Sequence, residues 1–151
     1  MKAWGVGIYQ NSVSDDFLRK IVIISIAAAK KATTGKKAFD PQTSPMPKDA
    51  LPIVIQALEC ARTPEEKLVT LDLACEMGNV AMIKEQRKDV LDSLSGELSP
   101  ERLMMWNNTR ERRDMLDELV ERCDDIMMRK RRCAPKFPKD WITRLMAKKN
   151  T

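Results

Sequence analysis

The sequence predicts an all-α fold: a single-domain, irregular or antiparallel bundle of six or seven helices with an N-terminal extended arm. Three observations predict it. Apolar residues recur at helical spacing along most of the 151 residues, helix-capping residues precede several of these segments, and short turns separate most of them. We expect an arm over residues 1–13, a helical core over residues 14–128, and a basic C-terminal segment with a short helix over residues 129–151.

The first expected helix begins near Ser14, which we interpret as its N-cap. The β-branched run at residues 21–24 could instead form a strand, but the alanines at residues 27–29 and the cap favour a helix. Because this segment is apolar nearly all round, we expect it to lie centrally. The next stretch, residues 33–48, contains three prolines and one glycine and predicts a loop.

The third expected helix has the clearest start signal. Asp49 is the expected cap of the second helix, which ends near Ala61. The run Thr63-Pro64-Glu65-Glu66 then combines an N-cap, a proline at the first helical position and a glutamate placed for a capping box. Its apolar stripe is followed by Gly78, which favours a left-handed helix end.

The second half of the chain predicts a fourth helix over about residues 80–94, a short fifth one near Trp106, and a long sixth one capped by Asn108. The sixth helix carries apolar residues at near-heptad spacing, which fits a coiled-coil seam or, because only about two heptads are present, more readily an intramolecular face. A last helix follows Pro138. The expected inward residues of these two helices are Leu116, Leu119, Cys123, Ile126, Trp141, Ile142, Leu145 and Met146.

Composition lowers the expectation of catalysis. The chain contains no histidine, which removes Ser–His and Cys–His nucleophile pairs and most zinc and iron sites. We therefore expect no enzyme, no catalytic residue, no metal and no cofactor. Its ten methionines indicate a Met-rich core or, alternatively, a Met-lined groove for a partner helix.

Cysteine usage and hydropathy predict a cytoplasmic protein that does not enter a membrane. None of the four cysteines forms a C-x-x-C pair, and Cys60, Cys75 and Cys123 lie within apolar helical stripes. We expect them to be buried, reduced thiols, with disulfides as the weaker alternative. The longest apolar stretch, residues 21–29, is far shorter than the roughly 20 residues that span a bilayer.

The basic C-terminal segment is the candidate binding site. Residues 129–151 contain nine lysines and arginines against one acidic residue, whereas the chain as a whole has a net charge of +5. Such a cluster could bind phosphates, with Trp141 stacking on bases, dock an acidic protein, or simply be a solvated helix end. The candidate residues are Arg129, Lys130, Arg131, Arg132, Lys136, Lys139, Trp141 and Arg144.

Acidic and basic residues interleave along the sixth expected helix. Paired carboxylates such as Asp114 and Glu118 can perform acid–base or metal chemistry. Without partners visible on another helix, intrahelical ion pairing is the favoured interpretation.

The N-terminal arm carries a motif, with the sequence A-W-G-V-G-I-Y-Q-N-S-V-S-D-D from Ala3 to Asp16. It is similar to the opening of an uncharacterised bacterial family, a domain of unknown function whose members begin W-G-x-G-I-Y-Q-N-D; Ser12 replaces the usual Asp. A looser similarity extends over residues 74–119. The resemblance implies an all-α family without an established activity. The matching structural residues are Trp4, Gly5, Gly7, Tyr9 and Asn11.

The same residues have a physical interpretation of their own. Trp4 and Tyr9 can anchor the arm on the helices by burying their rings, Gly5 and Gly7 allow a tight backbone path, and Asn11 can make a local turn bond. The alternative is a Gly-x-Gly backbone nest that binds an anion.

Taken together, these features predict a non-enzymatic protein–protein interaction or regulatory module with an unknown protein partner. The alternative is a nucleic-acid-binding protein that uses the basic C-terminal segment. The sequence does not decide the oligomeric state.

Overall fold

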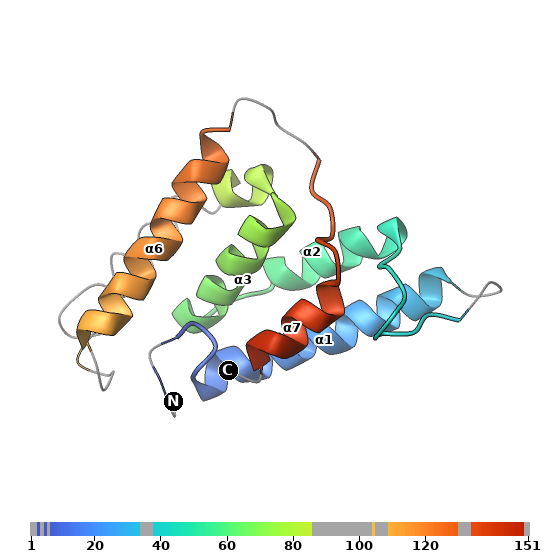
Figure 1. The fold of residues 1–151 in the computed structure, drawn as a ribbon, viewed down its shortest axis with the longest axis horizontal. Helices are drawn as coiled ribbons and strands as arrows, with labels where there is room; N and C mark the ends of the chain where they lie inside the picture. The colour runs from blue at the N-terminus through green and yellow to red at the C-terminus, as the bar shows by residue number, and fades with distance from the viewer. Residues whose placement is uncertain are drawn as a thin grey trace.

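The structure, a computed structural model, describes residues 3, 5, 7–33, 38–85, 104, 109–129 and 134–149. These residues form five α-helices with defined bounds, a short 3-10 helix, a helical stretch at residues 80–85, and no strand, so the predicted all-α fold is confirmed (Figure 1). The elements are α1 (Ser12–Ala32), the 3-10 helix η1 (Lys48–Ala50), α2 (Leu51–Glu59), α3 (Pro64–Met77), α6 (Thr109–Met127) and α7 (Trp141–Lys149).

Helix α1 forms the base of the bundle, and α3 lies between it and α6 (Figure 1). Helix α1 also packs against η1, α2 and α7. Helix α7 runs antiparallel to α1. Trp141 at the start of α7 donates a hydrogen bond to Ser25 in the middle of α1, at 3.2 Å. Lys148 at the end of α7 lies over the ring of Tyr9, which is just before α1. The two ends of the described chain are thereby brought together.

Helix α1 begins two residues earlier than predicted. The side chain of Asn11 accepts a hydrogen bond from the backbone N–H of Ser14 at 2.8 Å, so Asn11 is the N-cap and the predicted cap at Ser14 is wrong. The hydroxyl of Ser14 instead donates to the carbonyl of Glu65 at 3.4 Å and ties α1 to α3. Residues 12 and 13, which we expected in the arm, therefore belong to α1.

The start of the second helix also differs from the prediction. The chain enters α2 through η1, whose N-cap is Pro47, and Asp49 is exposed within η1, so the predicted cap at Asp49 is wrong. Helix α2 ends at Glu59, which leaves Cys60 exposed beyond it and makes the expected burial of that thiol wrong.

Helix α3 has the predicted start and end. Thr63 and Glu66 form the capping box, with the Thr63 hydroxyl accepting from the N–H of Glu66 at 3.2 Å, and Gly78 ends the helix with a left-handed φ of 63°. Every residue from Leu68 to Cys75 is buried. Helix α3 is thus a second central helix beside α1, which packs against η1, α2, α3 and α7 as expected of a central helix but keeps an exposed face where Ile23 retains 66% of its accessible surface.

The predicted inward residues of α6 are buried, and α6 packs on α3 of the same chain, as expected of an intramolecular face. In α7, Trp141, Ile142 and Leu145 are buried, whereas Met146 is 36% exposed. The predicted fourth helix beyond residue 85, the fifth helix and the cap at Asn108 lie outside the described residues.

The capping box of α3 yields a test of the fold. We expect Thr63→Ala to lower the free energy of unfolding by about 1 kcal/mol, because it leaves a backbone N–H at the start of α3 without its acceptor. Urea unfolding followed by circular dichroism measures the change. Thr143→Ala, an exposed position in α7, is the matched control and should change stability by less than about 0.5 kcal/mol.

Candidate functional site

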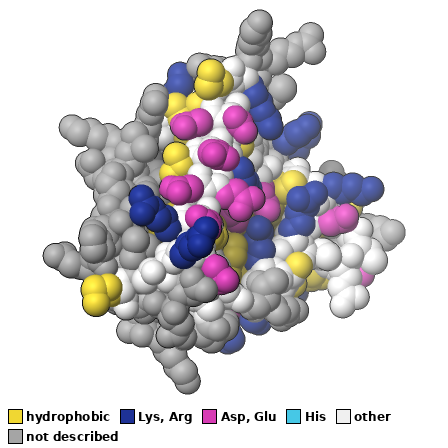
Figure 2. Space-filling model, turned by 60° about the vertical axis from the view of Figure 1, so that its left-hand side comes forward, with side chains coloured by type: hydrophobic (Ala, Val, Ile, Leu, Met, Phe, Trp, Pro, Cys, Tyr) yellow, Lys and Arg dark blue, Asp and Glu magenta, His cyan; other side chains and the backbone are white. Residues whose placement is uncertain are grey.

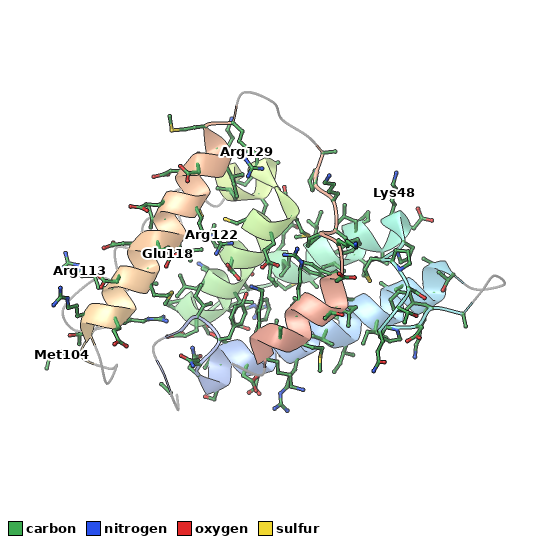
Figure 3. All side chains as sticks on the ribbon, in the orientation of Figure 1. Lys48, Met104, Arg113, Glu118, Arg122 and Arg129 are labelled. Carbon is green, nitrogen blue, oxygen red and sulfur yellow. The ribbon has the colours of Figure 1, made fainter. Side chains whose placement is uncertain are left out.

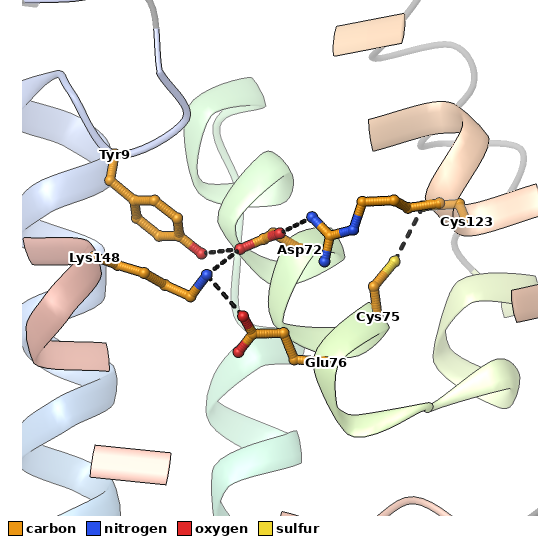
Figure 4. Close-up of polar contacts among 7 residues, drawn as sticks. Tyr9, Asp72, Cys75, Glu76, Cys123 and Lys148 are labelled. Carbon is orange, nitrogen blue, oxygen red and sulfur yellow. Dashed lines mark hydrogen bonds and ion pairs between the residues drawn. The ribbon is translucent and has the colours of Figure 1, made fainter. Parts of the chain in front are cut away.

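A cluster of five polar side chains lies where the N-terminal arm, α3, α6 and α7 meet, around the buried carboxylate of Asp72 on α3 (Figure 4). Asp72 accepts a hydrogen bond from the Tyr9 hydroxyl at 2.5 Å, and it forms ion pairs with Arg122 at 2.6 Å and Lys148 at 3.1 Å. Lys148 also pairs with Glu76 at 2.8 Å. We call Tyr9, Asp72, Glu76, Arg122 and Lys148 the Asp72 cluster.

Each member of the Asp72 cluster is placed by a different local feature. Asp72 and Glu76 are four residues apart on α3, so they share one face. Arg122 extends from α6 towards α3, whereas Arg113 on the same helix is exposed and extends outward (Figure 3). Lys148 comes from the last turn of α7, and its ammonium lies 5.2 Å from the centre of the Tyr9 ring.

Electrostatics keep the Asp72 carboxylate ionised despite its burial. Burial opposes ionisation, but the Lys148 ammonium, the Tyr9 hydroxyl and the Arg122 guanidinium outweigh it, so the pKa of Asp72 lies below its ordinary value of 3.8. Burial, followed by the negative charge of Asp72, holds the pKa of Tyr9 well above its ordinary value of 10.0. Tyr9 therefore remains a hydrogen-bond donor at neutral pH.

The Asp72 cluster is balanced in charge, and both carboxylate oxygens of Asp72 accept hydrogen bonds. Two carboxylates face two cations, and within the described part of the chain no three Cys, Asp or Glu residues are grouped to hold a metal ion. The second carboxylate oxygen of Glu76 is buried without a hydrogen-bond partner. A cluster of this kind ties the arm, α3, α6 and α7 together rather than presenting a free acid or base to a substrate.

The arm residues named by the sequence motif support this arrangement. Tyr9 is buried and bound to Asp72, and Asn11 caps α1. The N–H of Gly7 donates to the side chain of Gln10 at 2.9 Å, so it already has an acceptor and does not support an anion nest. A Cβ on Gly5 would lie 2.3 Å from the same side chain. Trp4 lies outside the described residues.

The structure separates the predicted basic binding residues. Arg129 and Lys136 line a hollow of about 340 Å³ at the end of α3, where Cys75 and Glu76 also lie. Lys139 and Arg144 are exposed at the start of α7, where Arg144 donates to the carbonyl of Lys139. Lys130, Arg131 and Arg132 lie outside the described residues.

The predicted role of Trp141 in stacking on bases is corrected by its burial. Its ring is only 1% exposed, because its indole N–H is bonded to Ser25 and its face packs near Phe137, with ring centres 5.5 Å apart. The ring is part of the core and is not available for stacking on bases.

The outer face of α6 is acidic, and Figure 2 shows its carboxylates gathered along this side of the molecule. Arg122 pairs with Asp72 on α3, and the intrahelical pairing expected for the other charged residues of α6 stays a prediction. The exposed carboxylates are Asp114, Asp117, Glu118, Glu121, Asp124 and Asp125.

An apolar groove lies between α1, α7 and the loop that precedes η1. It has a volume of about 530 Å³ and includes the exposed side chain of Met146. We call it the α1–α7 groove. A smaller hollow of about 250 Å³ adjoins it and includes Lys139 and Asp140. The predicted inward position of Met146 is wrong, because the packing of three distant segments leaves its side chain at the surface of this groove. Its lining residues are Ile26, Pro41, Gln42, Ile142, Thr143 and Met146.

Comparison of this chain with protein-family models, curated proteins and solved structures finds no match. The similarity of the N-terminal motif to a bacterial family therefore stays a prediction. No helix among the described residues is long and apolar enough to cross a membrane.

Because Asp72 pairs with two cations, replacing this one carboxylate should strongly lower the stability of the fold. We expect Asp72→Asn to lower the free energy of unfolding at pH 7 by about 3 kcal/mol, because it leaves the cations of Arg122 and Lys148 without their shared carboxylate. Asp114→Asn, an exposed carboxylate on α6, is the matched control. Equal urea midpoints for the two variants would contradict a stabilising role of the cluster.

The same carboxylate predicts a pH dependence. Because the pKa of Asp72 is lowered on folding, its stabilisation is present above the ordinary pKa of 3.8 and is lost as the pH falls through the folded value. The difference in unfolding free energy between the wild type and Asp72→Asn should therefore stay constant from pH 7 to about pH 5 and shrink below about pH 4. A difference in unfolding free energy that grows on acidification would contradict the lowered pKa of Asp72.

Proposed function

We propose that this chain is a non-enzymatic protein-binding module that holds an acidic amphipathic helix of a partner protein in the α1–α7 groove. The observation that carries the proposal is the apolar surface left open there. Ile26, Ile142 and Met146 line the groove, and Ile23, 66% exposed, lies on the same face of α1 one turn earlier. Apolar surface of this kind on a helical protein is typical of a helix-in-groove contact.

The charge around the α1–α7 groove decides which helix fits. Lys30 follows Ile26 by four residues on α1, and Lys149 follows Met146 by three on α7, so both lie along the faces that form the groove. Lys139 lines the adjoining hollow, where Asp140 is the acidic neighbour. Cations thus outnumber carboxylates here, which favours an acidic partner in both encounter rate and specificity.

Two observations favour protein binding over the rival functions. Both carboxylate oxygens of Asp72 are bonded and its charge is balanced, which disfavours this carboxylate as an acid or a base. Burial of Trp141 removes the ring expected to stack on nucleic-acid bases. Nucleic-acid binding by the basic C-terminal segment stays the alternative, supported by the charge of residues 129–151. We place the module in the cytoplasm, because paired reduced thiols suit a reducing compartment.

A designed peptide tests the groove. We expect the chain to bind a fluorescent peptide of about 18 residues, with leucines on one helical face and glutamates elsewhere, more tightly than a peptide that carries lysines instead of glutamates. Met146→Glu should weaken binding of the acidic peptide roughly tenfold, since it places a carboxylate on the apolar wall. Fluorescence anisotropy at low and moderate salt measures both affinities.

Met128→Glu is the matched control, because Met128 is 81% exposed at the end of α6, away from the α1–α7 groove. This variant should bind like the wild type. Equal affinities for the acidic and basic peptides, or an unchanged affinity of Met146→Glu, would refute the proposal. Salt-sensitive binding of random-sequence RNA that competes with neither peptide would favour the alternative.

A further inference from the structure

Two thiols meet at the contact between α3 and α6. The sulfur atoms of Cys75 and Cys123 lie 3.3 Å apart, and both side chains are buried (Figure 4). Closing this distance to the 2.05 Å of a disulfide requires a movement of about 1.2 Å, within the reach of side-chain adjustment. The residues are 48 positions apart in the sequence, so the contact is a product of the tertiary fold.

The Asp72 cluster holds these thiols in place. Cys75 follows Asp72 by three residues on α3, and Cys123 directly follows Arg122 on α6. The ion pair of Arg122 with Asp72, at 2.6 Å, therefore fixes the register of the two helices at the level of the sulfur atoms. The two thiols are aligned by a charged contact that does not depend on them.

The surroundings make the thiols unequal. The contact with Cys123, followed by burial, raises the pKa of Cys75. The contact with Cys75 outweighs burial and, with the Arg122 guanidinium, lowers the pKa of Cys123. The Arg122 guanidinium beside the pair favours a thiolate there, and the 3.3 Å contact supplies the second thiol that a disulfide requires.

A small oxidant can reach the pair from the surface. Cys75 lines the hollow of about 340 Å³ at the end of α3, where Arg129 and Lys136 lie at its edge. Hydrogen peroxide is small enough to enter a hollow of this size, whereas glutathione disulfide is a much larger molecule.

We propose that Cys75 and Cys123 are a peroxide-sensitive pair that forms a disulfide between α3 and α6. The thiolate of one cysteine attacks one oxygen of hydrogen peroxide, the O–O bond breaks, and the leaving hydroxide takes up a proton to become water. The thiol of the other cysteine then attacks the sulfur of the resulting sulfenic acid, forms the S–S bond and releases a second water. Two thiols are oxidised, and one peroxide is reduced to two waters. This inference is independent of the α1–α7 groove.

The test uses a chain in which Cys60→Ser and Cys133→Ser leave only Cys75 and Cys123. After treatment of the folded protein with hydrogen peroxide, alkylation in denaturant and trypsin digestion, we expect one cross-linked product that joins peptides 68–84 and 123–129. Alkylation should be lost at both cysteines together. The oxidised protein should also have a higher urea midpoint than the reduced protein, because the bond links segments far apart in the chain.

The reference for the rate is a variant that retains only Cys60, the exposed cysteine. We expect the pair to be consumed several-fold faster than Cys60, despite its burial. A variant that retains only one cysteine of the pair should accumulate a sulfenic acid that dimedone captures, because the second thiol is absent. The proposal is overturned if Cys60 reacts first, or if peroxide gives no cross-link at concentrations that oxidise Cys60 fully.

Discussion

A carboxylate inside a helical bundle must be matched by donors and cations, and the way Asp72 is matched organises this molecule. Its partners come from three other segments: Tyr9 from the arm, Arg122 from α6 and Lys148 from α7. The arm and α7 are the two ends of the described chain, and α6 packs on α3 rather than on α1. Asp72 is therefore the point at which the closing contacts of the fold converge.

The same constraint determines which parts of the molecule remain for function. Helix α7 is held at its start by the bond from Trp141 to Ser25 and at its end by Lys148, so it forms a fixed wall for the α1–α7 groove. The pairing of Arg122 with Asp72 sets the register of α6 on α3 and with it the contact of Cys75 and Cys123. An apolar groove and a thiol contact are thus both consequences of how one buried charge is neutralised.

Local signals in the sequence predicted the elements, and tertiary contacts explain the errors. The capping box at Thr63 and the glycine at position 78 act within one helix, so they were readable from the sequence. Asn11 and Ser14 are both good caps, and only the bond from Ser14 to Glu65 shows why Asn11 caps α1. Asp72 could not be recognised in advance, because a polar residue on an amphipathic helix ordinarily faces solvent and its partners are 50 or more residues away. Trp141 belonged to an apolar stripe as well as a basic segment, and the stripe determined its position.

The central claim is that four segments share one buried contact, and hydrogen exchange of the Lys148→Met variant tests it most directly. This change removes the contribution of α7 alone. If Asp72 couples the segments, exchange should accelerate not only in α7 but also in residues 7–11 and in α6, neither of which contains the substituted residue. Faster exchange confined to α7 would contradict the account, because it would mean that the segments are held independently of one another.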